Sequence, residues 1–244
     1  MKQSKKLMTT LIIFTLGILT SCSIFIKDGI TGNGQIVTKE ITVDSFNELE
    51  VDGVFNIVFR QGKKEAVTIE ADENIAKLIQ VKNSNNTLIV DYKDRVSIKE
   101  STKLNVYITV TNITRIDLNI VGDVVTEGIL NQDYVNIINN GVGDVDLNIN
   151  CKSLIVNNSS VGNFRISGQS NKLNLSNSGV GDLLAKKFIS NTVVVSNSGV
   201  GDIDVYAHNN LDVTANGVGN VNYYGNPKTK QIKNNAVGDV TERN

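Results

Sequence analysis

Carboxylate and amide side chains recur in this chain of 244 residues at one position of a repeated phrase, Val-Gly-Asp or Val-Gly-Asn. The phrase returns along the second half of the chain, so its last position supplies a column of acids and amides. The members of this column are Asp123, Asp144, Asn163, Asp182, Asp202, Asn220 and Asp239. The column is the strongest candidate for chemistry in the chain.

Three roles are open to this column. Each Asp or Asn can accept hydrogen bonds from turn amides and close its bend, which would make the column structural. Adjacent carboxylates such as Asp182 and Asp202 can share a calcium ion with backbone carbonyls, although the glycine-rich nonapeptide calcium repeat is absent. Two acids about 5 Å apart suit a retaining glycosidase, but a catalytic pair should stand out from a repeat. We expect the structural role, with no cofactor.

The other reactive residues are isolated in the sequence. His208 is the single histidine, which excludes a metal site built from several histidines and leaves a nucleophilic triad one candidate base. Its neighbours indicate an exposed turn. Cys151 lies near the start of an expected strand and is interpreted as an unreactive, buried or half-buried thiol. No glycine-rich loop opens a helix, so no phosphate-binding motif is found.

The glycines of the repeated phrase define the elements that must position the column. They are 18 to 21 residues apart and stand at Gly122, Gly143, Gly162, Gly181, Gly201, Gly219 and Gly238. A period near 20 indicates a solenoid. Apolar residues alternate on both sides of each glycine, as in Leu173-Asn-Leu175 and Ile203-Asp-Val205. Alternation with period 2 indicates strands with one face inward. We therefore predict an all-β fold, a right-handed parallel β-helix with coils of about 20 residues over 113–244.

A second polar column stands four residues before the glycines, and Ala215 interrupts it. Its members are Asn139, Asn158, Asn177, Asn197 and Asn234. Asparagines stacked at a bend can bond the turn backbone and one another, so we predict an inward-facing amide ladder. We also predict that the valines before the glycines face inward, so that Asp in place of Val180 or Val200 would prevent folding.

The start of the chain indicates export. Residues 1–21 combine an early basic stretch with a short apolar run, which is typical of a signal peptide. The ending Leu19-Thr-Ser-Cys22 resembles the bacterial lipobox, which implies cleavage before Cys22 and a diacylglycerol on its sulfur. Such an anchor holds a protein to a membrane without a spanning helix. Residues 22–34 are expected to form a flexible tether, because glycines are frequent in them.

The composition argues against nucleic acid as a partner. Removing residues 1–21 leaves 21 Lys and Arg (24 less three) against 25 Asp and Glu. This balance lacks the basic stripe that nucleic acid requires. Tyr206 and Tyr224 are expected to face outward in neighbouring coils and are a candidate contact patch.

Residues 35–112 lack the period but continue in strands, and we predict a β-rich N-terminal module. One or two helical turns are expected within 72–81, with Asp72 as cap, and a loop with a strand is the alternative. The stretches Phe46-Asn-Glu-Leu-Glu-Val51, Asp52-Gly-Val-Phe-Asn-Ile57, Arg60-Gln-Gly62 and Val67-Thr-Ile-Glu70, with Asn-Ser-Gly-Val-Gly-Asp at 177–182 and 197–202, carry a family resemblance.

Over about residues 36–226 the chain resembles the putative autotransporter adhesin, head GIN domain family. The resemblance implies an exported all-β protein of parallel β-helix modules. We therefore expect a non-catalytic, lipid-anchored protein of the cell envelope at the outer membrane. It would work as an adhesin or scaffold that presents its solenoid surface to a glycan or a protein. The alternative is a polysaccharide-cleaving enzyme on the same fold.

Overall fold

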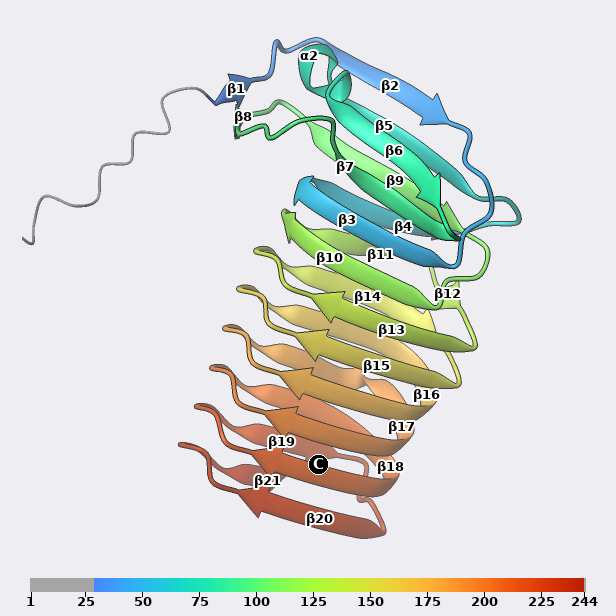
Figure 1. Cartoon of the computed structure of the whole chain (residues 1–244). Coiled ribbons are helices and arrows are strands. Elements are labelled where there is room, and N and C mark those ends of the chain that lie inside the picture. The colour runs from blue at the N-terminus through green and yellow to red at the C-terminus, as the bar shows by residue number, and fades with distance from the viewer. Residues whose placement is uncertain (1–28, 244) are drawn as a thin grey trace, which may run out of the picture.

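The computed structural model describes residues 29–243, which form two facing sheets wound into a parallel β-solenoid (Figure 1). The predicted all-β class and the parallel stacking of coils are confirmed. The predicted signal peptide and Cys22 lie outside the described residues.

The N-terminal part contains nine strands and one helical turn. They are β1 (Ile30–Thr31), β2 (Ile36–Ile41), β3 (Glu48–Val54), β4 (Asn56–Gln61), β5 (Ala66–Asp72), α2 (Glu73–Ala76), β6 (Ile79–Ser84), β7 (Thr87–Tyr92), β8 (Ile98–Glu100) and β9 (Leu104–Val110). The repeats contain the remaining strands. They are β10 (Arg115–Val121), β11 (Val124–Glu127), β12 (Leu130–Asn131), β13 (Tyr134–Asn139), β14 (Val145–Asn150), β15 (Ser153–Asn158), β16 (Phe164–Asn177), β17 (Leu183–Asn197), β18 (Ile203–Ala215), β19 (Val221–Tyr224), β20 (Thr229–Asn234) and β21 (Val240–Glu242).

Each coil crosses from one sheet to the other at its Val-Gly phrase. The strand before the phrase pairs in parallel with its equivalents, as β13 does with β10 and β15. The strand after the phrase does the same in the facing sheet, as β14 does with β11 and β16. The valines of all seven phrases bridge to one another in order from Val121 to Val237. Equivalent residues of successive coils therefore stack in register along one axis, as the repeat predicts.

The core lies between the two sheets and is built from the even positions counted from each glycine. In the coil around Gly181, Leu173, Leu175, Leu183 and Ala185 are all buried. Burial of such columns from both sheets is the main stabilising term, because one coil alone leaves its apolar face in water.

The inward placement predicted for the phrase valines is wrong. Val180 is 51% exposed and Val200 is 47% exposed, and the equivalent valines of the other coils are exposed to a similar or greater degree. The valine stands one residue before the glycine, at an odd position, so the alternation of the strand turns its side chain outward.

The N-terminal part continues the solenoid, but its coils are not in chain order. The coil made by β3 and β4 pairs in parallel with β10 and β11 on one side. On its other side the same coil pairs in parallel with β7 and β9, which come later in the chain. The predicted boundary between 112 and 113 therefore falls inside one continuous hydrogen-bonded stack. Antiparallel strands β2, β5 and β6 complete the N-terminal end (Figure 1).

The described end of the expected tether is hydrogen-bonded to the N-terminal part. β1 pairs with β8, and the Gly32 amide donates to the Glu100 carbonyl at 2.8 Å. A side chain at Gly32 would meet the Asp72 carboxyl, because an added Cβ would lie 2.4 Å from it. This segment packs against the N-terminal end of the stack.

The helical turn α2 follows Asp72, but the Asp72 side chain does not cap it. Its Oδ1 accepts from the Gly34 amide at 2.7 Å, and its Oδ2 accepts from the Thr102 amide at 2.7 Å and the Lys103 amide at 3.4 Å. Burial opposes ionisation of Asp72, but these amides outweigh it and lower the pKa of the carboxyl. Asp72 thus joins the starts of β2 and β9.

Candidate functional site

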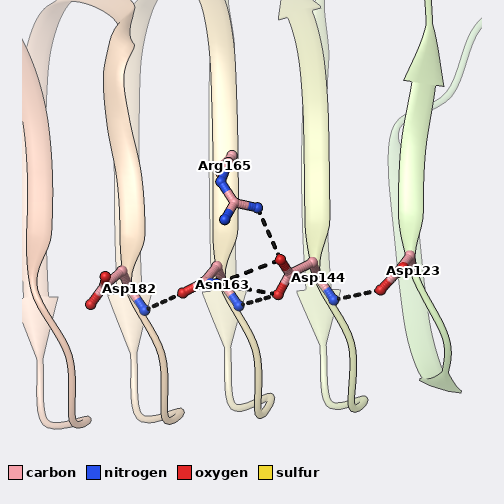
Figure 2. Close-up of polar contacts among 5 residues, drawn as sticks. All are labelled: Asp123, Asp144, Asn163, Arg165 and Asp182. Carbon is pink, nitrogen blue, oxygen red and sulfur yellow. Dashed lines mark hydrogen bonds and ion pairs between the residues drawn. The ribbon is translucent and has the colours of Figure 1, made fainter.

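The column of acids and amides forms a ladder of hydrogen bonds along one edge of the solenoid, which we name the Asx ladder. Each Oδ1 accepts from the backbone amide of the equivalent residue in the next coil, at 2.7 to 3.1 Å. Figure 2 shows four members, in which Asp123 accepts from Asp144, Asp144 from Asn163, and Asn163 from Asp182. The side chains therefore join coil to coil, whereas the sequence suggested that each would close its own turn.

The backbone carbonyls of the Asx ladder tie each coil to the one before it. The carbonyl of Asn163 accepts from the Val145 amide at 2.8 Å, and the carbonyl of Asp182 accepts from the Phe164 amide at 2.8 Å. Each ladder residue from Asp123 to Asn220 consequently bonds both neighbouring coils, and Asp239 bonds the coil before it. The phrase glycine beside it has a positive φ, +131° at Gly181, and an added Cβ there would lie 2.2 Å from the Gly162 carbonyl oxygen. Only glycine allows the coils to approach this closely.

Asp144 shows how the ladder holds its charge. The Asn163 amide, the Arg165 guanidinium and the Asn163 side chain together hold the pKa of Asp144 below its usual range. Arg165 reaches Asp144 Oδ2 with Nη1 at 3.0 Å (Figure 2). The carboxylate is a stable anion committed to neighbours, which suits it to a structural role and not to that of a general acid.

The two aspartates of the calcium hypothesis do not form a preassembled cluster of metal ligands. Asp182 and Asp202 are neighbours in the ladder, but Asp182 Oδ1 accepts from the Asp202 amide at 2.9 Å. Within residues 29–243, no three His, Cys, Asp or Glu side chains come together as a group that could hold a metal ion.

The asparagine column forms a second, buried ladder. Asn139 donates to Asn158 at 3.0 Å, Asn158 to Asn177 at 2.9 Å, and Asn177 to Asn197 at 3.0 Å. All four are buried. Ala215 ends the series, and the Nδ2 of Asn197 is left without a hydrogen-bond partner. Asn234, in the last coil, is exposed and donates instead to the Gly238 carbonyl at 3.0 Å.

Cys151 and His208 do not form a nucleophile and base pair. Both line one open hollow at the corner opposite the Asx ladder, but the strand pairing places them three coils apart. Three coils correspond to about 14 Å at about 4.8 Å each. Burial raises the pKa of the Cys151 thiol to about 11, so it stays protonated and unreactive at neutral pH.

The structure brings Tyr206 and Tyr224 together in a lateral hollow of about 560 Å³, on the outer face of the sheet that contains β17, β18 and β19. Tyr206 and Tyr224 are partners in the pairing of β18 with β19, whereas Tyr223, which pairs with Val205, is buried in the core. Lys186, Lys187 and Arg243 line the same hollow. These cations were not among the predicted site residues, because their column does not repeat.

Sequence reasoning also missed the first member of the Asx ladder. Asn56 accepts from the Asp123 amide with its Oδ1 at 3.0 Å and donates to Asn105 with its Nδ2 at 3.2 Å. Phe55 stands where the later coils have glycine, so the phrase cannot be recognised there. The apolar Ile57 after Asn56 was the remaining signal.

The fold is a parallel β-solenoid with polar ladders in register, and antiparallel strands close one end of it. Such a protein presents a similar surface at each coil. The family model described as "Putative auto-transporter adhesin, head GIN domain" matches residues 45–227. The chain belongs to this family. No protein of curated function matches it.

Solved structures share the fold. A putative adhesin from Bacteroides fragilis is 31% identical, with a TM-score of 0.85 over 88% of this chain and all of its own. A putative lipid binding protein from Parabacteroides distasonis is 18% identical, with a TM-score of 0.65 over 88% of this chain and all of its own. A putative adhesin from Parabacteroides merdae is 21% identical, with a TM-score of 0.58 over the same shares. The first supports an adhesin-like, surface-located protein, and the other two support the fold alone.

Proposed function

We propose that the chain is a non-catalytic lipoprotein of the cell envelope that presents the outer surface of its solenoid to a glycan or protein partner. The observation that carries the proposal is the Asx ladder, in which the acids along the repeat are hydrogen-bonded to the next coil. The acids of the ladder therefore serve as acceptors between coils, which argues against their use as a catalytic pair for glycoside cleavage. Membership of an adhesin family agrees with this role.

The proposed anchor is a diacylglycerol on Cys22, at the outer membrane. Within residues 29–243, no helix is long and apolar enough to cross a membrane. The support for Cys22 comes from the resemblance of residues 19–22 to the lipobox. Expression of the full chain in a diderm bacterium with radiolabelled palmitate tests it. We expect label and membrane fractionation for the wild type, and loss of both for Cys22→Ser. Equal labelling of the two proteins contradicts the anchor.

Binding and catalysis are separated by two assays on residues 23–244. A glycan array should give retained ligands, and incubation with the same polysaccharides should release no new reducing ends. New reducing ends that disappear in an Asp182→Asn variant would establish the enzyme alternative. An empty array, with no capture of envelope proteins from the same organism, would remove the adhesin proposal.

A further inference from the structure

The lateral hollow is the place where the solenoid departs from regular repetition. The coil that begins at Gly181 is 20 residues long and the next is 18. Strand β17 absorbs the difference, since Ala185 pairs with Val205 but the next pair is Ile189 with Tyr206. Three residues of β17 thus have no partner on β18, which is a bulge.

The bulge turns two successive lysines outward. In a regular strand neighbouring side chains point to opposite faces, yet Lys186 and Lys187 are both exposed between buried Ala185 and Phe188. Lys186 then extends over the Tyr224 ring, with its Nζ 4.0 Å from the ring centroid. The bulge therefore concentrates positive charge over an aromatic floor.

The lining of the hollow is positively charged, although Lys186 and Lys187 also line an adjoining hollow with Asp146 and Asp204. Its lining contains Lys186, Lys187 and Arg243 and no Asp or Glu. Among the described residues, none of these three cations is in an ion pair, and Arg243 donates instead to the Asn222 amide oxygen at 3.0 Å. Because the whole chain has a formal charge of −1, three unpaired cations in one hollow favour an anionic ligand.

The floor of the hollow is apolar and shaped by packing. Ile189 is 51% exposed beside Tyr206. The Tyr206 ring lies against Gly225, where an added Cβ would come within 2.6 Å of it. This floor suits a ligand with flat C–H faces, and the lysines and the arginine suit carboxylates on its rim.

These features select among anionic ligands. β17 and β18 each have partners on both sides, so an acidic peptide would find no free edge on these two strands to pair with. The hollow is an open depression on a sheet surface and does not enclose an acyl chain. We propose that it binds a saccharide that carries carboxylates, of the uronate type. This inference rests on the proposed binding function and names its ligand class.

Calorimetric titration with tetragalacturonate tests the proposal on residues 23–244. The fully methyl-esterified tetramer is the matched neutral ligand, and tetraglutamate is the acidic peptide. We expect the acid tetramer to bind, its affinity to fall with added salt, and the ester and peptide to bind at least tenfold more weakly. Equal binding of the ester removes the role of charge, and tighter binding of the peptide assigns the hollow to a protein partner. Either result overturns the proposal, as does no binding of the acid tetramer.

Variants locate the binding. The double variant Lys187→Gln and Arg243→Gln should weaken binding of the acid tetramer at least tenfold. The double variant Lys39→Gln and Lys63→Gln removes the same charge from exposed positions outside the hollow and should have no effect. Ile189→Glu places a carboxylate on the floor at an exposed position and should abolish binding without loss of the folded state. Circular dichroism and melting check that state. Unchanged affinity in these variants would refute binding of the tetramer in the hollow. It would not refute the proposed binding function, which the glycan array tests separately. If the tetramer is bound and also cleaved, the hollow remains the proposed binding site, but the proposal of a non-catalytic function is refuted.

Discussion

Replacing Ala215 with Asn should stabilise the protein, because it would fill a gap in the buried asparagine ladder. Ala215 pairs with Asn197 on one side and Asn234 on the other. Asn197 is fully buried, and its Nδ2 has no partner. In each preceding step of the ladder this nitrogen donates to the next asparagine at about 3.0 Å. The slot at 215 is therefore surrounded by the groups that an amide there would bond.

The magnitude follows from the orphan donor. A buried polar group without a partner costs about 1–3 kcal/mol, and ordering a new Asn side chain takes back up to about 1 kcal/mol. The net gain is about 1–2 kcal/mol in the free energy of unfolding. For a chain of this size that corresponds to a rise of about 2–8 °C in Tm.

Thermal and urea unfolding measure the gain, and hydrogen exchange locates it. The amides of Gly179 and Gly199 donate to the Asn Oδ1 of their own coils at 3.3 and 3.1 Å. The amide of Gly217, two residues after position 215, should likewise exchange more slowly in the variant. Ala185→Asn is the matched control, since Ala185 is equally buried but lies outside the asparagine column and pairs with Val205, and it should destabilise. A Tm for Ala215→Asn at or below that of the wild type would refute the reasoning.

Three further predictions test other parts of the structure. Val180→Asp should leave Tm within a few degrees of the wild type because the side chain is exposed. Val195→Asp should prevent folding because it buries a charge, as circular dichroism would show. An equal loss of structure in both variants would indicate that the phrase valines are buried. The stability that ionised Asp72 contributes should be complete above its unfolded pKa of about 3.9 and be lost as the pH falls through its lowered folded pKa. Urea midpoints of the wild type and Asp72→Asn should therefore differ at pH 7 and converge in acid, and a constant difference would contradict this. Calcium should give neither heat in calorimetry nor a shift in Tm, and a shift that disappears in Asp182→Asn plus Asp202→Asn would establish a site.

The alternation within the repeats made most of the solenoid predictable. Positions such as Leu173 and Leu175 recur in each coil, so their placement in the core could be read from the sequence. The same parity, applied to Val180, would have placed it outside; treating the valine as part of the core because it is apolar produced the error. At Val180 the residue type predicts a buried side chain and the position predicts an exposed one. The pleat of the strand determines the direction of the side chain, so the position gives the correct answer.

The N-terminal end could not be predicted to the same depth. The β3–β4 coil lies between strands that follow it in the chain, and no periodicity encodes that order. Asn56 could not be assigned to the Asx ladder because Phe55 replaces the glycine that marks the other coils. The lateral hollow depends on a difference in length between two successive coils, so it becomes visible only when their strands are paired.

Coil length varies on one side of the solenoid only. The bridges from Val121 to Val237 keep the Val-Gly corner in register throughout. The carbonyl of the preceding coil lies so close to each phrase glycine that there is no room for a side chain. The register shifts in β16, β17 and β18 all lie beyond that corner. The Val-Gly corner thus fixes the register of the coils. On the opposite side, around residues 186–191, longer loops and new ligand contacts can be gained without disturbing the stack.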